Sequence, residues 1–159
     1  MNEEVINNLP VDAKKEFIKL GLKLAEKKTK TKVHDDFLSF VKHVWPEFIE
    51  GKHHKEIADK FNDIANKKIK RLIINMPPRH TKSEFASFLL PAWMVGRKPD
   101  LKIIQSTHTT ELAIRFGRKA KNLMDSPEYK QVFKTRLRED SQAAGKWETE
   151  QGGEYYAAG

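Results

Sequence analysis

Residues 71–97 constrain the fold of this chain more than any other stretch, because three local patterns follow one another there. Residues 71–75, RLIIN, form a short run rich in β-branched side chains and predict a strand buried on both faces. The pair Pro77–Pro78 ends this run. Residues 82–96, KSEFASFLLPAWMVG, are apolar on nearly every side, which indicates a helix buried against a sheet. The predicted order is strand, loop and buried helix.

The loop between them, residues 76–83 or MPPRHTKS, carries part of the chemistry of a phosphate-binding loop. Such a loop needs backbone N–H groups curved toward phosphate oxygens, a lysine that reaches the terminal phosphates and a hydroxyl that holds Mg²⁺. Lys82 and Ser83 supply the last two, at the start of a helix whose dipole favours anions. Against the pattern G-x-x-x-x-G-K-[ST], Met76 and Thr81 occupy the glycine positions. Either the backbone turns without a positive φ at Thr81, or the strain there is tolerated.

An α/β alternation continues after the buried helix. Residues 101–107, LKIIQST, predict a second strand, and residues 109–124 predict an amphipathic helix with an inward face formed by Leu112, Phe116, Ala120 and Leu123. Two strands joined by a crossover helix predict a parallel pair with a right-handed connection. Ligands of such sheets bind beyond the carboxyl ends of the strands, where MPPRHTKS lies.

Upstream of residue 71 the periodicity predicts helices. Residues 11–28 form an amphipathic helix with Asp12 as the expected N-cap, and residues 29–33 are expected to be an exposed basic linker. One face of this first helix contains Phe17, Leu20 and Leu24. A second helix begins at Asp35 or Asp36 and ends before Pro46.

A third helix is predicted over residues 53–68, and His54 falls on its inward face with Ile57, Phe61 and Ile64. Two interpretations of His54 stay open: a hydrogen-bonded core histidine, or a contact to the edge of a nucleotide base.

Composition and charge narrow the class of protein. Among the 159 residues 33% are charged and 38% hydrophobic, the balance of a globular protein. No apolar run approaches the roughly 20 residues of a membrane span. The first ten residues do not have the pattern of a secretory signal. Without cysteine there is neither a disulfide framework nor a thiolate metal site, so the cytoplasm is the default compartment. The formal net charge of +8 favours polyanionic partners. The basic residues cluster in the middle third, as Lys67, Lys68, Lys70, Arg71, Arg79 and Lys82, and as Arg115, Arg118, Lys119 and Lys121.

Several motifs together resemble one family. A strand followed by MPPRHTKSE, then PAW, a GRKPD turn before the second strand and SPEY after the next helix, is similar to the ATPase domain of bacteriophage terminase large subunits, the motors that package viral DNA into procapsids. The resemblance covers about residues 45–159. It implies an ASCE-type P-loop NTPase fold, with a parallel sheet and flanking helices, whose N-terminal portion is residues 34–159. Residues 1–33 would be an appended helix and basic linker.

The resemblance also implies the roles of individual residues. Lys82 and Ser83 would hold the phosphates of ATP and its Mg²⁺, and Arg79 would sense or stabilise the γ-phosphate, so Arg79 and Lys82 are the candidate catalytic residues. The candidate nucleotide-binding residues are Pro78, Arg79, His80, Thr81, Lys82, Ser83, Glu84 and His54. The adenine site is expected near Trp45 to His54. The PPR sequence in place of the first glycine is a habit of the family, whereas the position of Thr81 is usually glycine.

Full-length terminase large subunits are ring-forming motors, so the resemblance implies a homo-oligomeric ring when the protein is full length. It implies duplex DNA, a terminase small subunit and the portal protein as partners, and no membrane. The expected location is the host cytoplasm rather than the mature virion. It also implies an Asp-Glu strand that holds Mg²⁺ and activates water, and a C-terminal nuclease. Neither is found in this sequence, which ends in an expected hairpin over residues 146–158 with its turn at residues 151–153. The chain is therefore expected to be an N-terminal fragment that binds ATP weakly and does not turn it over.

Arg115 and Arg118 share one sector of their helix with Asn122. They are either a solvated basic face or arginines that act on a neighbouring subunit's nucleotide. Trp93 is expected to pack in the core. Two alternatives to the packaging motor stay open: a helicase-like DNA translocase, and a nonenzymatic basic DNA-binding or assembly module with a degenerate loop.

Overall fold

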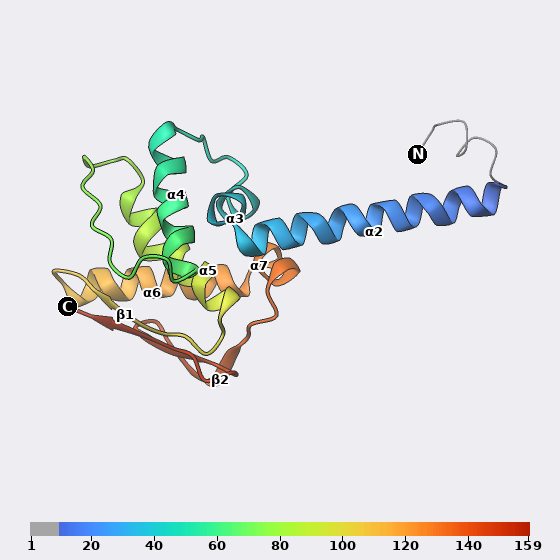
Figure 1. Cartoon of the computed structure of the whole chain (residues 1–159). Helices are drawn as coiled ribbons and strands as arrows, with labels where there is room; N and C mark the ends of the chain where they lie inside the picture. The colour runs from blue at the N-terminus through green and yellow to red at the C-terminus, as the bar shows by residue number, and fades with distance from the viewer. Residues whose placement is uncertain (1–9) are drawn as a thin grey trace.

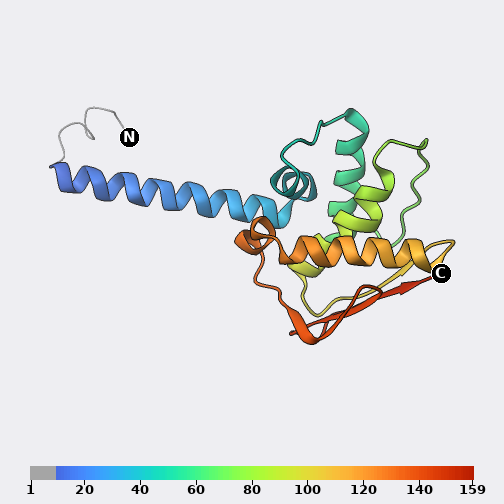
Figure 2. The same cartoon turned by 180° about the vertical axis from the view of Figure 1, so that it is seen from behind.

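The computed structural model describes residues 10–159. The expectations about the first nine residues lie outside this range. A long helix, α2, projects from a body in which α6 lies between a sheet and the remaining helices (Figures 1 and 2). The helices are α2 (Val11–Asp35), α3 (Phe37–Val44), α4 (Lys52–Ala65), the π-helix η1 (Glu84–Leu89), α5 (Leu90–Arg97), α6 (Thr110–Asp125) and α7 (Pro127–Val132). The strands are β1 (Lys102–Ser106), β2 (Leu137–Ala143), β3 (Lys146–Thr149) and β4 (Glu154–Ala158).

The sheet is mixed, with strand order β1-β4-β3-β2. Only β1 and β4 are parallel, with Ile103 opposite Tyr155, and the other two pairs are antiparallel. One face of β1 and β4 packs against α6, which buries Tyr155 and Ala157. The chain is thus a mixed α/β fold with flanking helices, as predicted at that level. The expected parallel pairing between residues 71–75 and 101–107 is wrong, because β1 takes its parallel partner from the C-terminal hairpin.

Residues 71–75 form no strand, which corrects the prediction of a strand buried on both faces. Leu72 and Ile74 are half-buried against the core, whereas Ile73 is 85% exposed. The alternation shows that the run has one inner face, like a half-buried strand, although it joins no sheet. A β-branched run favours an extended backbone, but a strand also needs a neighbour to complete its hydrogen bonds.

The helix after the loop is continuous through η1 and α5 and buries Phe85, Leu89 and Trp93. It packs among α2, α3 and α6, so the expectation that it lies on a sheet is wrong. Its first part is a π-helix in which the N–H of Leu90 donates to the carbonyl of Phe85. Pro91 follows directly, and because proline has no N–H and crowds the preceding turn, a widened turn accommodates it.

Helix α2 continues through residues 29–33, so the linker predicted there is wrong, although the segment is exposed except for Val33. The hydroxyls of Thr29 and Thr31 donate to the carbonyls of Ala25 and Lys27, four residues earlier, which satisfies them inside the helix. No glycine or proline interrupts the segment. Pro10, not Asp12, is the N-cap residue.

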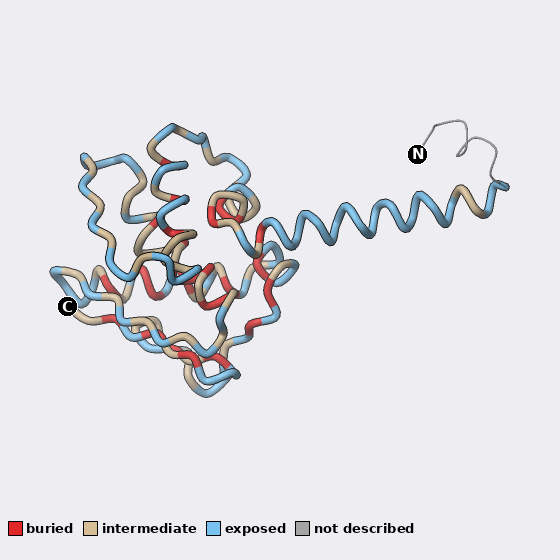
Figure 3. The backbone as a smooth tube through the Cα atoms, in the orientation of Figure 1, coloured by how far each residue is buried: buried red, intermediate tan, exposed pale blue. Residues whose placement is uncertain are grey.

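The predicted end of the second helix is confirmed: α3 ends at Val44, ahead of Pro46. Asp36 caps its start by accepting from the N–H of Ser39 at 2.8 Å. The ring of Phe37 then meets those of Phe61, Phe85 and Trp93 edge-on, with centroids 5.1–5.4 Å apart. This aromatic cluster joins α3, α4, η1 and α5, and Figure 3 shows the buried segments gathered there and along the sheet, while α2 is largely exposed.

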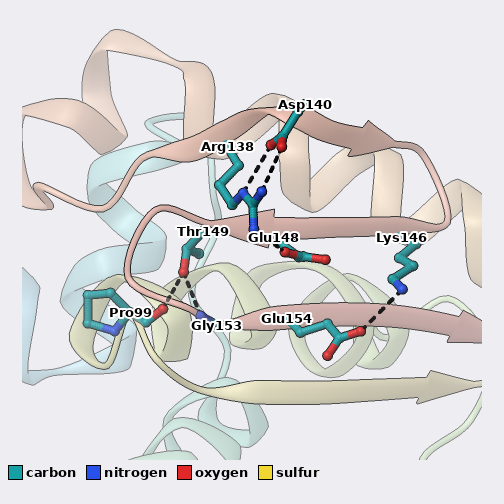
Figure 4. A network of polar contacts seen from close by, with 8 residues as sticks. All are labelled: Pro99, Arg138, Asp140, Lys146, Glu148, Thr149, Gly153 and Glu154. Atoms are coloured by element: carbon teal, nitrogen blue, oxygen red, sulfur yellow. Dashed lines mark hydrogen bonds and ion pairs between the residues drawn. The ribbon is translucent and has the colours of Figure 1, made fainter.

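The predicted C-terminal hairpin is confirmed as β3 and β4, with Gly152 at φ 86 in its turn. Polar side chains stabilise it: Thr149 donates to the carbonyl of Pro99 and accepts from the N–H of Gly153, and Lys146 pairs with Glu154 (Figure 4). In β2, which was not predicted, Arg138 pairs with Asp140 and with Glu148 of β3.

None of the helices within residues 10–159 combines the length and the apolar character that a membrane crossing requires.

Candidate nucleotide-binding site

The loop of residues 76–83 surrounds a hollow of about 330 Å³, which we call the loop hollow. Its lining residues are Pro77, Pro78, Arg79, His80, Thr81, Lys82, Ser83 and Glu84. All the loop candidates predicted from the sequence therefore lie around one hollow. Its volume falls at the lower end of the range of roughly 300–1,000 Å³ that small-ligand sites occupy.

The loop backbone is left-handed at two positions, with φ 65 at Arg79 and φ 58 at Thr81. Alternation of backbone handedness over successive residues makes concavities that bind anions through N–H groups. The sequence left two alternatives, a turn without a positive φ at Thr81 or a tolerated strain there, and the structure has the second. For a β-branched residue this conformation costs on the order of 1–3 kcal/mol, so surrounding contacts have to maintain it.

His54 supplies such a contact from α4. Its Nε2 lies 2.6 Å from Oγ1 of Thr81, and Oγ1 donates to the carbonyl of His80 at 2.7 Å. His54 is only 6% exposed, and its ring forms a cluster with those of Phe48 and Phe85, whose centroids are 4.8 and 5.1 Å away. Burial lowers the pKa of His54, and charge on His53 and His80 lowers it further against the opposing effect of Glu50.

Lys82 and Ser83 lie where the loop meets the buried helix. The half-buried Lys82 reaches back across the loop, and its Nζ donates to the carbonyl of Met76 at 3.3 Å. Ser83 is exposed, and its side chain does not cap η1. A phosphate in the loop hollow would give Lys82 a charged acceptor in place of a neutral one, and the Ser83 hydroxyl could join the ligands of a nucleotide-bound Mg²⁺.

Glu84 lines the loop hollow, but its carboxylate is paired with Lys119 of α6. The Nζ of Lys119 lies 2.7 and 2.9 Å from the two carboxylate oxygens, and it also lies over the ring of Phe88. This ion pair fixes the start of the buried helix against α6. Among the described residues that line the loop hollow Glu84 is the single carboxylate, and its pairing leaves no obvious base for activating water.

A second concavity adjoins the loop. A groove of about 580 Å³, which we call the side groove, lies between α4 and the extended residues 72–76. Its lining includes His53, Ile57 and Met76, and Nε2 of His53 is buried there without a hydrogen-bond partner among the described residues. His53 falls within the segment expected near the adenine, whereas Trp45 packs on Phe48.

Arg115 and Arg118 lie on the exposed side of α6 and line a separate hollow of about 740 Å³ with Thr109 and Thr110. This hollow shares no residue with the loop hollow. Neither arginine lines the loop hollow, although Lys119, which follows Arg118, pairs with Glu84 of that hollow. Both interpretations of the two arginines stay predictions. Trp93 is fully buried, as expected, and its Nε1–H donates to the carbonyl of His34.

Two contacts that shape the site were missed in the sequence, His54 with Thr81 and Lys119 with Glu84. Both join residues 27 or more positions apart. The inward position of His54 on its helix was visible, but its partner was not. No group of three or more His, Asp or Glu side chains within residues 10–159 is arranged to hold a metal ion by itself.

No protein-family model matches this chain, and no curated protein or solved structure shows significant similarity to it. The resemblance to terminase large subunits therefore rests on the motifs in the sequence.

Proposed function

We propose that this chain is the ATP-binding part of a terminase large subunit, the motor that drives double-stranded DNA into a procapsid. One observation carries the proposal: the backbone is left-handed at Thr81, where phosphate-binding loops have glycine. Lys82 and Ser83 follow directly and border the same hollow. A lysine, a hydroxyl and a concave backbone are the groups that the β- and γ-phosphates of Mg·ATP require.

In this proposal the nucleotide base occupies the side groove. It is lined mainly by α4 and by apolar residues of the extended segment, and it meets the loop at Met76, where Lys82 donates its hydrogen bond. The unpartnered Nε2 of His53 is a polar group that a base edge could satisfy. Phosphates in the loop hollow and a base in the side groove are compatible with one bound nucleotide.

The wider role is proposed from the resemblance of the motifs to terminase large subunits and from the charge of the chain. Net charge +8 and basic residues near the loop support contact with the DNA backbone. The terminase small subunit, the portal protein and neighbouring copies in a ring are the partners that the proposal implies, in the host cytoplasm. Because the carboxylate in the loop hollow is paired with Lys119, we expect this chain to bind ATP and to hydrolyse it slowly at most.

The test is calorimetric titration of Mg²⁺ and a non-hydrolysable ATP analogue into the chain and two variants. Lys82→Ala removes the cation that faces the phosphates, and we expect binding to weaken about 10- to 100-fold, the worth of a charged hydrogen bond. Lys134→Ala removes an exposed lysine outside the site and should leave affinity unchanged. Equal loss in both variants, or binding that ignores Lys82, would refute the proposal.

A further inference from the structure

The hydrogen bonds of His54 determine which of its nitrogens carries the proton. Nδ1 accepts from the N–H of Gly51 at 2.8 Å, so in the neutral ring the proton is on Nε2. Nε2–H then donates to Oγ1 of Thr81, and the single hydrogen of that hydroxyl goes to the carbonyl of His80. The chain of bonds runs in one direction from α4 into the loop. Both ring nitrogens are occupied, so His54 has no nitrogen left for a nucleotide base.

The ring of His54 is held firmly enough to act on the loop. It is buried in the first turn of α4, and the ring of Phe85 that packs on it belongs to the helix leaving the loop. The imidazole of His54 thus contacts both Thr81, whose backbone is strained, and the π-helix η1 that follows the loop. Thr81 is held through its side chain at the position where the loop backbone needs a left-handed conformation.

We infer that His54 is a positioning residue for the phosphate loop, which holds Thr81 left-handed through its hydroxyl so that a loop without glycine keeps its anion-binding shape. This inference rests on the proposed nucleotide function for its consequence, but the His54–Thr81 contact can be measured without nucleotide. The hydroxyl is the essential group: serine retains it, valine has the same shape without it, and glycine needs no support.

The test is a double-substitution cycle read by the affinity for Mg²⁺ and the ATP analogue. His54→Phe keeps a ring packed against Phe48 and Phe85 but removes both nitrogens, and we expect affinity to fall about tenfold. Thr81→Val should cause a similar loss, and adding His54→Phe to it little more. Thr81→Ser should bind like the natural chain. In a Thr81→Gly background, His54→Phe should change affinity less than about twofold, because glycine adopts the conformation unaided.

An equal loss on His54→Phe in the threonine and glycine backgrounds would overturn the inference, since His54 would then act by a route other than Thr81. Imidazole ¹⁵N NMR of the nucleotide-free chain gives an independent result. We expect the Nε2–H tautomer for His54, with the ring proton slow to exchange, and loss of that protection in Thr81→Val. An Nδ1–H tautomer, or a freely exchanging proton, would overturn the inference. If no variant binds nucleotide although the NMR signature is present, the proposed function fails and the positioning contact stands.

Discussion

Residues 71–75 and strand β1 have similar sequences, RLIIN and KIIQS, and each leads through a turn into a helix, yet only β1 is a strand. Neither is deeply buried at its centre, since Ile73 is 85% and Ile104 is 77% exposed. The difference is the neighbour: β4 pairs with β1 along all five of its residues, and residues 71–75 pair with no strand. A β-branched run thus specifies an extended backbone, and pairing depends on what another part of the sequence supplies.

The two segments are consequently held in place by different forces. β1 is fixed by backbone hydrogen bonds to β4. Residues 71–75 are held by the inward side chains of Leu72 and Ile74, and the loop that follows is held by His54 through Thr81. A ladder of backbone bonds tolerates many side-chain changes, whereas a segment fixed by a few side chains depends on each of them.

The largest effect should come from breaking the support of β1. Tyr155, opposite Ile103, is fully buried and stacks on Trp147 with ring centroids 4.7 Å apart. Tyr155→Ala should lower the free energy of unfolding by about 3–5 kcal/mol, the usual cost of emptying a large aromatic site. Its neighbour Tyr156 is 49% exposed, and Tyr156→Ala should cost less than about 1.5 kcal/mol. Urea unfolding measures both, and similar costs would contradict the face assignment of β4.

Proline substitutions in matched pairs separate backbone pairing from side-chain burial. Ile103 and Ile74 are both half-buried, and Ile104 and Ile73 are both exposed. Adjacent residues of an edge strand alternate in the direction of their N–H groups, so one of Ile103 and Ile104 donates to β4 and the other does not. Proline at the donating position removes that bond. It should therefore cost about 1–3 kcal/mol more than proline at the matched position, Ile74 for Ile103 or Ile73 for Ile104. Urea unfolding of the four variants is the measurement. Equal costs within both pairs would show that residues 71–75 are also hydrogen-bonded in solution.

The smallest effect should be a pH dependence confined to the side-chain support of the loop. The pKa of buried His54 lies below its ordinary value, so the unfolded chain binds a proton at a higher pH than the folded chain does. Its contribution to stability is complete above the unfolded pKa of about 6.5 and is lost as pH falls through the lower folded value. Urea unfolding at pH 7.5 and below 6 should show a smaller decrease in His54→Phe than in the natural chain, and identical decreases would contradict this.

Local signals in the sequence predicted the elements that depend on local chemistry. Asp36 and Pro46 mark α3 because a cap and a helix breaker act within a few residues, and Gly152 marks the hairpin turn for the same reason. The loop residues could be named as a candidate phosphate site because their chemistry is concentrated in eight successive positions. The partner of β1, the residues that contact Thr81 and Glu84, and the layer against which α5 packs depend on distant segments, which periodicity does not reveal. The linker prediction failed because no glycine or proline interrupts residues 29–33, and the threonine hydroxyls there bond to carbonyls within α2.

Helix α2 also sets a length scale for the molecule. At 1.5 Å per residue, its 25 residues extend about 37 Å, whereas a compact chain of 159 residues has a radius of gyration of about 15 Å. The end of α2 near Asp35 is fixed to the body by Val33 and by the hydrogen bond from Trp93 to His34, so the helix is attached at one end only (Figure 1). A small rotation at that root sweeps the Val11 end through a wide arc. Because α2 is one continuous helix, its Val11 end is held at the full length of the helix from the body.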